Sequence, residues 1–380
     1  MGVLRIPRIL NKELLLLVAL SLVAVGAFIF TRRLAARERQ LETKIAAIWF
    51  QRGEEYLRTG QTDKAIQAFR KATSDIGDNQ KYVLALARAL AAEKHSAEAQ
   101  QLLLRLRESD PEDPEINIHL ARLAASQNDT QQAVHYYQSA LYGRWPSDQV
   151  NERRKLRFEL VHFLLDHQQR ELATSELLIL QARTPDSAAA HVELAKLFVE
   201  AGDALRALAE YSEAARLENT NGEALTGAGN AAFQLGEYGK AEQFLRAALK
   251  LDPDSPRTRQ LLTLTQLVQG EDPLAPHLSA LDRQKRLLSD LERSANRVDD
   301  CLSQSTSAEA SAELQALKAE ALTAVPKLSS KSHSPDSDAV RSGIGLMFRM
   351  QQAASAACGV PTMEDQALLL IGRQHSGDRP

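Results

Sequence analysis

Cysteine and recognisable catalytic motifs are what this 380-residue sequence has least of. Only two cysteines are present, Cys301 and Cys358. No CxxC pair exists, which excludes the usual zinc and thioredoxin-like patterns. The metalloprotease, hydrolase and phosphate-loop motifs HExxH, GxSxG and GxxxxGK are also missing. The sequence therefore predicts no metal, no cofactor and no catalytic residues, and we expect a protein that is not an enzyme.

The sequence also lacks a large net charge and has few aromatic residues. The net charge is -3, with 46 Lys and Arg against 49 Asp and Glu, so the chain as a whole has no electrostatic attraction for nucleic acid. Aromatic residues make up 5% of the chain, and strand-forming residues are scarce. Ala and Leu are abundant, and both lose little conformational freedom in a helix. This composition predicts an all-α fold and no nucleic-acid partner.

One long uncharged segment lies near the start of the chain. Residues 14–31 contain no charged side chain, and as a helix they would be roughly 27 Å long, close to the hydrocarbon thickness of a bilayer. A cleaved signal peptide is the alternative, because Val25-Gly-Ala27 resembles a cleavage site, but the apolar run continues through Phe30. No cysteine lies nearby for lipid attachment. We therefore expect a tail at 1–13, a single membrane-spanning helix at 14–31 and a juxtamembrane helix or linker at 32–45.

The orientation of this anchor is less clear from the sequence. Basic residues flank both ends of the apolar segment, three before it and five after it, so the positive-inside rule does not decide which side the repeats face. The short amino-terminal tail, and two cysteines that could pair outside the cytoplasm, favour export of the bulk of the chain. We expect a single-pass protein of the cell membrane whose larger part is periplasmic or extracytoplasmic.

A 34-residue period follows the anchor. It begins with Trp49-x2-Arg52-Gly53-x2-Tyr56 and continues with Ala65-x3-Phe69-x2-Ala72. A six-residue insertion around Trp145-Pro146-Ser147 shifts the register once. The small residue expected in each second helix recurs six times, as Ala65, Ala99, Ala133, Ala173, Ala207 and Ala241. The large residue four positions later recurs as Phe69, Leu103, Tyr137, Leu177, Tyr211 and Leu245.

This pattern resembles the tetratricopeptide repeat, with Arg52 as a departure where the family has Leu. The layout of one anchor and a repeat array is similar to that of anchored repeat proteins of bacterial envelopes. The resemblance implies a right-handed α-solenoid of about six helix pairs over 46–270. The expected repeats lie near 46–79, 80–113, 114–147, 154–187, 188–221 and 222–255, followed by a capping helix at 256–270.

The last quarter of the chain is not periodic. We expect a smaller helical region at 271–326, a Ser-rich linker at 327–338, and short helices at 343–357 and 363–371 within a final segment 339–380. Cys301 and Cys358 lie in this quarter. They form either a disulfide or two buried free thiols, and the sequence does not decide between the two.

The resemblance also implies a concave inner groove, lined by positions 2, 5, 9 and 12 of each repeat. Positions 5 and 9 supply the candidate partner-binding residues. The apolar ones are Phe50, Leu84, Ile118, Phe158 and Val192, and the polar ones are Arg88, Arg122, His162, Lys196 and Asn230. Apolar rows beside a run of cations suit a protein or peptide segment with acidic residues. A solvated charged stripe is the alternative. The paired Lys and Asn residues of the family's carboxylate clamp are not reproduced, because Glu54 occupies one clamp position.

These observations favour a membrane-anchored scaffold or adaptor that binds a protein or peptide in its groove. One alternative is an enzyme or assembly factor whose activity resides in 278–380. A third reading is a structural protein that associates with itself. The sequence does not identify the partner.

Overall fold

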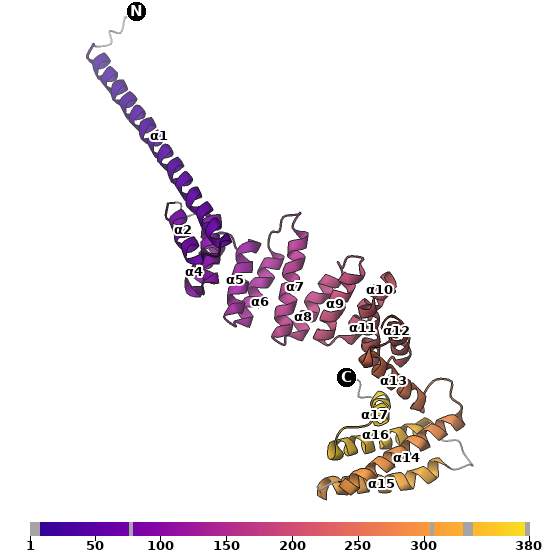
Figure 1. The fold of residues 1–380 in the computed structure, drawn as a ribbon. Coiled ribbons are helices and arrows are strands. Elements are labelled where there is room, and N and C mark those ends of the chain that lie inside the picture. Colours follow the sequence, from indigo (N-terminus) through magenta and orange to yellow (C-terminus); the bar gives the residue numbers. More distant parts are fainter. Residues whose placement is uncertain (1–7, 76–78, 305–307, 330–336, 377–380) are drawn as a thin grey trace, which may run out of the picture. The chain divides into compact units, whose positions relative to one another are not determined.

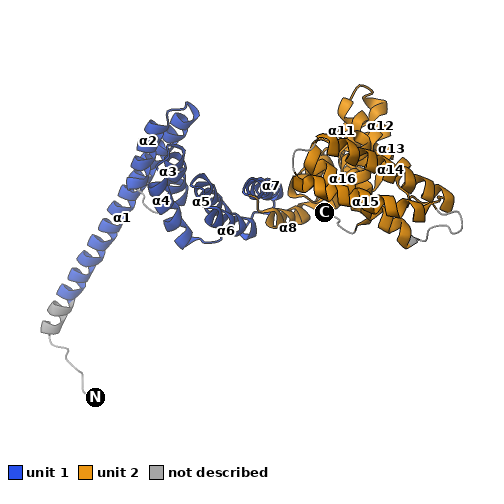
Figure 2. Ribbon diagram, turned by 90° about the horizontal axis from the view of Figure 1, so that it is seen from below, with its two compact units in different colours: residues 1–167 blue, residues 168–380 orange. Residues whose placement is uncertain are grey.

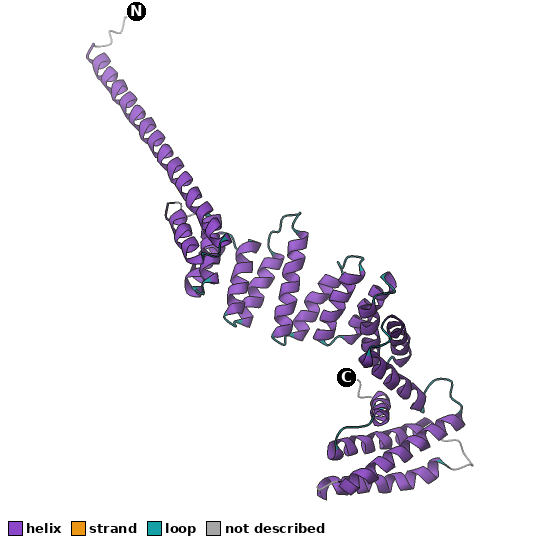
Figure 3. Cartoon of the chain, viewed as in Figure 1, coloured by secondary structure: helices purple, strands orange, loops and turns teal. Residues whose placement is uncertain are grey.

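The computed structural model describes residues 8–75, 79–304, 308–329 and 337–376. Within these ranges the chain forms 17 helices and no strand, as the composition predicts (Figures 1 and 3). Two compact units are present, Met1–His167 and Gln168–Pro380 (Figure 2).

The first unit contains seven helices. They are α1 (Arg8–Arg58), α2 (Thr62–Asp75), α3 (Gln80–Ala92), α4 (Ser96–Ser109), α5 (Pro114–Ser126), α6 (Thr130–Tyr142) and α7 (Val150–Asp166). Helix α1 is 51 residues long and runs without a break from the apolar segment into the first helix of the first repeat. No proline interrupts residues 8–58. The helix is long and apolar enough to cross a membrane, and its apolar part is exposed.

The second unit contains the remaining repeats and the last quarter of the chain. Its helices are α8 (Arg170–Gln181), α9 (Ala188–Ala201), α10 (Ala204–Leu217), α11 (Gly222–Gln234), α12 (Tyr238–Leu251), α13 (Pro256–Glu271), α14 (Ala280–Gln304), α15 (Ala308–Leu328), α16 (Ser337–Cys358) and α17 (Met363–His375).

Small residues form the seams of the repeats. All six alanines of the second-helix position are fully buried. A Cβ atom at Gly53 would lie 2.4 Å from the Phe69 ring, and one at Gly229 would lie 2.7 Å from the Leu245 side chain. The large residue of each second helix therefore occupies the space that the small residue of the first helix leaves. This confirms the packing expected from the 34-residue pattern.

The turns within the repeats share one backbone conformation. Gly60, Gly202 and Gly236 have φ values of 74°, 85° and 74°, and Asn128 has 59°, all in the left-handed region. Glycine and asparagine adopt this region at low cost. Lys94 and Gln168 take the same conformation, with φ values of 62° and 59°. The turn geometry is thus kept even where the residue is less suited to it.

The last helices share a core with the end of the repeat array. One cluster of buried side chains joins Tyr238 of α12 and Val268 of α13 to Leu287, Met347 and Leu368 of α14, α16 and α17. Helix α13, expected as a cap, packs against both α12 and α17. The C-terminal helices are therefore continuous with the array through this core.

Two boundaries in the last quarter differ from expectation. Helix α15 extends to Leu328, and α16 begins at Ser337, six residues before the expected start at 343, so it is longer than the short helix predicted. Gly343 does not interrupt α16. A Cβ atom there would lie 2.7 Å from Leu287, so the glycine allows α14 to approach closely. Part of the expected tail, residues 1–7, and part of the expected Ser-rich linker, residues 330–336, lie outside the described residues.

Candidate functional site

A hollow of about 640 Å³ lies on the first two repeats. It brings together three of the residues predicted to bind a partner, Phe50 of α1 with Leu84 and Arg88 of α3. The other residues that line it are Glu54, Leu57, Phe69, Gln80, Lys81, Ala85 and Glu115. Leu57, at position 12 of its repeat, is 38% exposed. The hollow thus combines apolar side chains with charges of both signs.

The apolar row of position 5 is mostly buried between repeats rather than open. The Phe50 ring lies 4.6 Å from that of Tyr82 and 5.6 Å from that of Phe69, measured between centroids. Leu84 and Val192 are also buried, while Ile118 and Phe158 are half-buried. Phe50 and Leu84 therefore present only part of their surface to the hollow, and that the row as a whole binds a partner stays a prediction.

The cations of position 9 have partners within the chain. Arg88 Nη1 lies 3.8 Å from Glu115 Oε1, and Lys196 Nζ lies 2.5 Å from Glu223 Oε1. In both pairs the glutamate is 27 residues later, at position 2 of the following repeat. His162 is exposed on α7.

Arg122 makes two hydrogen bonds to its partner. Its Nε and Nη2 atoms donate to the two carboxylate oxygens of Glu159 at 2.7 Å each, and the Tyr137 hydroxyl donates to Glu159 Oε1 at 2.9 Å. Burial acts to raise the pKa of Glu159, but these hydrogen bonds outweigh it and the pKa is lowered. The expected run of cations is therefore a row of ion pairs between repeats, which removes the argument for a uniformly acidic guest.

His119 lies within electrostatic reach of Arg88 and Arg122, and the sequence reasoning missed it. Burial, and then the positive charges of Arg88 and Arg122, lower the pKa of this half-buried side chain to about 4. The imidazole is therefore neutral at physiological pH. Its place one residue after a position-5 residue was the signal that could have drawn attention to it.

A second hollow, of about 420 Å³, lies on the last repeat. Among the predicted residues it contains Asn230, beside Thr226, Ser255 and Thr258. Gly227 is required here, because a Cβ atom would lie 2.5 Å from the Tyr211 ring. Small and polar groups dominate this hollow, whereas the first one also has large aromatic and aliphatic side chains.

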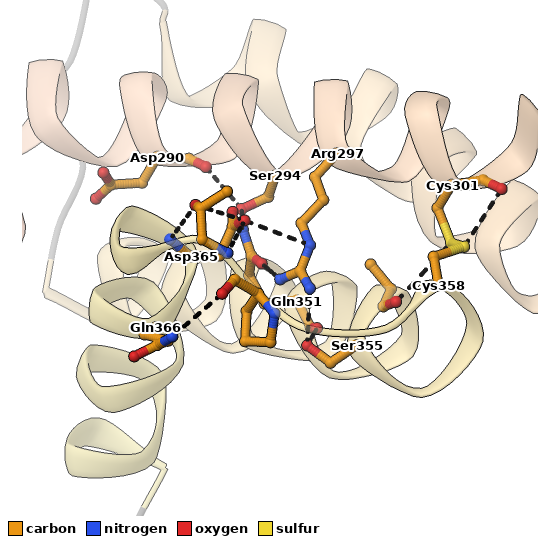
Figure 4. Close-up of polar contacts among 12 residues, drawn as sticks. Asp290, Ser294, Arg297, Cys301, Gln351, Ser355, Cys358, Asp365 and Gln366 are labelled. Atoms are coloured by element: carbon orange, nitrogen blue, oxygen red, sulfur yellow. Dashed lines mark hydrogen bonds and ion pairs between the residues drawn. A yellow bond between two sulfur atoms is a disulfide. The ribbon is translucent and has the colours of Figure 1, made fainter. Parts of the chain in front are cut away.

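Figure 4 shows a polar network inside the C-terminal helices. Arg297 of α14 donates to Gln351 Oε1 and to Ser355 Oγ of α16, and its Nε lies 3.5 Å from Asp365 Oδ2 of α17. Asp365 also completes the capping box of α17 with Thr362. Arg297 and Asp365 line a hollow of about 530 Å³, but their polar atoms are engaged with each other's helices. Their geometry fits a role in positioning α17.

Cys301 and Cys358 form a disulfide, so the structure selects the first of the two alternatives. The bond joins α14 to the last residue of α16, with Cα atoms 5.6 Å apart, inside the range that unstrained disulfides occupy. The bond lies beside the Arg297 network in Figure 4. It closes a segment of 57 residues, most of the C-terminal region.

One group of possible metal ligands occurs in the described residues. Asp186, His191 and Glu213 have ligand atoms within 4.8 Å of one another. However, Arg216 donates to both carboxylate oxygens of Glu213, at 2.8 and 2.6 Å, and His191 Nδ1 lies 2.6 Å from Glu210 Oε2. Arg216 therefore already neutralises the charge of the Glu213 carboxylate in this cluster.

Residues 56–123 and 198–264 match the family model of the tetratricopeptide repeat. These two segments are tetratricopeptide repeats. Repeats of this family mediate protein–protein interactions and bind protein or peptide partners, and the fold is typically not an enzyme. No curated protein matches the chain.

Several solved tetratricopeptide structures are similar to the chain at low identity. PilF of Pseudomonas aeruginosa is 17% identical, with 58% of this chain and 98% of that one covered and a TM-score of 0.38. PilW, described as a widely conserved type IV pilus biogenesis factor, is 20% identical, with coverages of 57% and 98% and a TM-score of 0.36. YrrB, described as having an unusual peptide-binding site, is 16% identical, with coverages of 51% and 97% and a TM-score of 0.38. These similarities say nothing about the partner of this chain.

Proposed function

We propose that this chain is a membrane-anchored scaffold that holds a segment of a partner protein in the hollow of its first two repeats. The observation that carries the proposal is the continuity of α1. One helix supplies both the apolar segment and Phe50, Glu54 and Leu57 of the hollow. A guest bound there is kept within one helix length of the anchor.

The lining of the hollow suggests what the guest presents. Leu57 and the accessible edges of Phe50 and Leu84 favour an apolar side chain. Around them, Glu54 and Glu115 stand beside Lys81 and Arg88. Because both signs are present, we infer a guest with an apolar anchor residue flanked by mixed or neutral polar residues.

We further propose that the repeats lie outside the cytoplasm. Disulfides persist in oxidising compartments and are rare in the reducing cytosol, and the Cys301–Cys358 bond links two helices of the C-terminal region. The basic residues on both sides of the apolar segment leave the orientation open, so the disulfide is the stronger argument.

The binding proposal is tested by photo-crosslinking in native membranes. A photoreactive amino acid at position 85, which lines the hollow, should give a crosslinked product with the partner. Leu57→Asp should reduce that product at least about tenfold, since a charge in an apolar contact costs more than the 1.4 kcal/mol of a tenfold affinity change. The matched control is Leu251→Asp, at a residue that is 45% exposed on α12, and it should leave crosslinking unchanged. Equal loss in both variants, or in neither, would contradict the hollow as the binding site.

The orientation is tested on intact cells with a membrane-impermeant maleimide. Because both cysteines are in the disulfide, labelling should appear only after treatment with a reductant. Cys301→Ser should expose Cys358 to labelling without reduction. Labelling that requires cell lysis in every case would place the repeats in the cytoplasm.

A further inference from the structure

Asp290 of α14 stands apart from the other buried carboxylates of the C-terminal helices. Its side chain is completely buried, and neither carboxylate oxygen accepts a hydrogen bond from a donor among the described residues. Asp365 and Asp272, by comparison, are bonded to Thr362 and His375. A buried carboxylate without a partner is rare and calls for a physical explanation. Figure 4 shows the Asp290 carboxylate pointing away from the Arg297 network.

The charged groups around Asp290 belong to the junction between α13 and the C-terminal helices. The carboxylates of Glu271 and Asp272, at the end of α13, and Arg293 of α14 act on it electrostatically. Arg293 Nη1 lies 3.5 Å from Glu271 Oε1. His375 Nε2 of α17 lies 3.0 Å from Asp272 Oδ1.

The other polar groups at this junction are engaged elsewhere. Arg286 of α14 donates to the backbone carbonyls of Gln269 and Asp272 at 3.1 and 3.0 Å. Helix α16 contributes the amide of Gln351, which donates to Ser294 Oγ, while Ser294 in turn donates to the Asp290 carbonyl. Among the described residues, no cation is therefore bonded to the Asp290 carboxylate itself.

An ionised carboxylate at this place would carry the full cost of burial next to two further negative charges. Burial first, and then the charge of Glu271, raise the pKa of Asp290 to about 8, with Arg293 opposing the shift. A protonated Asp290 can donate its proton to the neighbouring Glu271 carboxylate. An ionised one only repels it.

We propose that Asp290 is protonated in the folded protein and acts as a latch between the last repeat helix, α13, and the C-terminal helices, with the Glu271 carboxylate as the acceptor of its proton. While the proton is bound, the two carboxyl groups hold α13 against α14. When it is lost, two adjacent negative charges occupy a buried interface, and α14 and α17 open from the array. The latch makes the docking of the C-terminal helices sensitive to an alkaline shift in the surrounding medium.

The direction of this pH dependence follows from the difference in bound protons between the folded and the opened state. The folded pKa is raised above the ordinary value of 3.8, so the folded state binds a proton that the unfolded or opened state releases. The contribution of the latch is fully present below the ordinary value and is lost as the pH rises towards about 8. Asp290→Asn keeps the size and the donor of a protonated carboxyl and cannot ionise, so it removes this dependence.

The experiment compares amide hydrogen exchange of α14 and α17 in the full-length chain in detergent, variant against wild type at each pH. With one proton released on opening, the opening constant of the wild type relative to Asp290→Asn should grow about tenfold per pH unit between pH 5.5 and 7.5. This relative opening constant should stop rising above pH 8. The matched control is Asp300→Asn, the same substitution at an exposed position of the same helix, and its ratio to wild type should not change with pH.

Two further variants separate the groups involved. Glu271→Gln removes the nearest negative charge, so the pKa of Asp290 should fall. The relative opening constant should then stop rising at a lower pH than in the wild type. Histidines in general titrate between pH 5 and 8, so His375→Gln is included, and it should keep the slope of the wild type. A ratio for Asp290→Asn that is flat with pH, or an Asp290→Asn protein that opens more readily than wild type, would overturn the proposal. Either result would mean that Asp290 is ionised in the folded protein.

Discussion

Contacts in the repeats and contacts in the C-terminal helices span different lengths of chain. In the repeats, the polar pairs Arg70–Glu98, Gln181–Glu210 and Arg122–Glu159 are 28, 29 and 37 residues apart, about one repeat. In the C-terminal helices, Gln351 reaches Ser294 over 57 residues and Arg297 reaches Ser355 over 58. His375 meets Asp272 over 103 residues.

The difference shows two ways of stabilising a helical chain. Each repeat buries a small seam against its neighbour, so its stability is local and close to additive along the array. The C-terminal helices lack a periodic seam and depend on a few distant contacts, whose loop closure costs entropy. In the C-terminal helices, the disulfide and the buried polar network provide the stabilisation that the small-residue seams provide in the repeats. If this is correct, changes in the two regions should differ in size and in reach.

The largest effect should come from removing the disulfide. A bond that closes 57 residues restricts the unfolded chain and contributes about 4 kcal/mol in the loop-entropy model. Cys301→Ser with Cys358→Ser should lower the unfolding free energy of α14–α17 by about this amount. Hydrogen exchange of peptides from α2–α6 should be unchanged. Reduced wild-type protein is the control and should match the double variant, whereas an equal loss of protection in α2–α6 would break the distinction between the regions.

A smaller loss should follow from overfilling a seam. Gly229→Leu places a side chain where even a Cβ atom lies 2.7 Å from Leu245, and overpacking of this kind typically costs up to about 3 kcal/mol. Urea unfolding followed by hydrogen exchange should show the loss in α11, α12 and their neighbours. The control is Gly239→Ala in α12, where no atom lies within 4 Å of the added Cβ. It should raise stability slightly, because alanine favours the helix over glycine.

The two regions also differ in how much of them the sequence predicts. The 34-residue spacing of Ala65 and its equivalents predicts the seams, and Gly60, Gly202, Gly236 and Asn128 predict the left-handed turns. These features are local, and they recur often enough to exceed chance. The Arg297 network joins side chains 54 and 58 residues apart with no repeating pattern, so a single sequence could not pair them. The two cysteines, 57 residues apart, could be named as a possible pair, but only the structure decides that they are bonded.

The inner face shows a different limit of sequence reasoning. The family resemblance implies that position 9 faces the groove, and the sequence has Arg88, Arg122 and Lys196 at that position. Their pairing with Glu115, Glu159 and Glu223 is visible in part, since two of these glutamates share position 2 of the next repeat. Glu159 lies one turn further along, after the six-residue insertion, so only the structure reveals that pair. Likewise, family positions indicate where a groove residue stands but not how deeply the neighbouring repeat covers it.

The smallest effect should come from the Arg122–Glu159 pair. This pair tests whether pH changes the stability of the two regions in opposite directions. Both side chains are partly exposed, so Glu159→Gln should cost below about 1 kcal/mol at pH 7. The pKa of Glu159 is lowered, so its contribution to stability is present above the ordinary glutamate value of 4.5 and is lost as the pH falls through the lowered folded value.

Asp290 has the opposite shift, so the same acid treatment that weakens the Arg122–Glu159 pair should strengthen the junction at α13. Hydrogen exchange of α5 and α7 against α14, compared at pH 7 and pH 4 in wild type, Glu159→Gln and Asp290→Asn, measures both signs in one chain. If the two regions responded to pH in the same direction in the wild type, the distinction between a partly exposed, paired carboxylate and a buried, protonated one would be wrong.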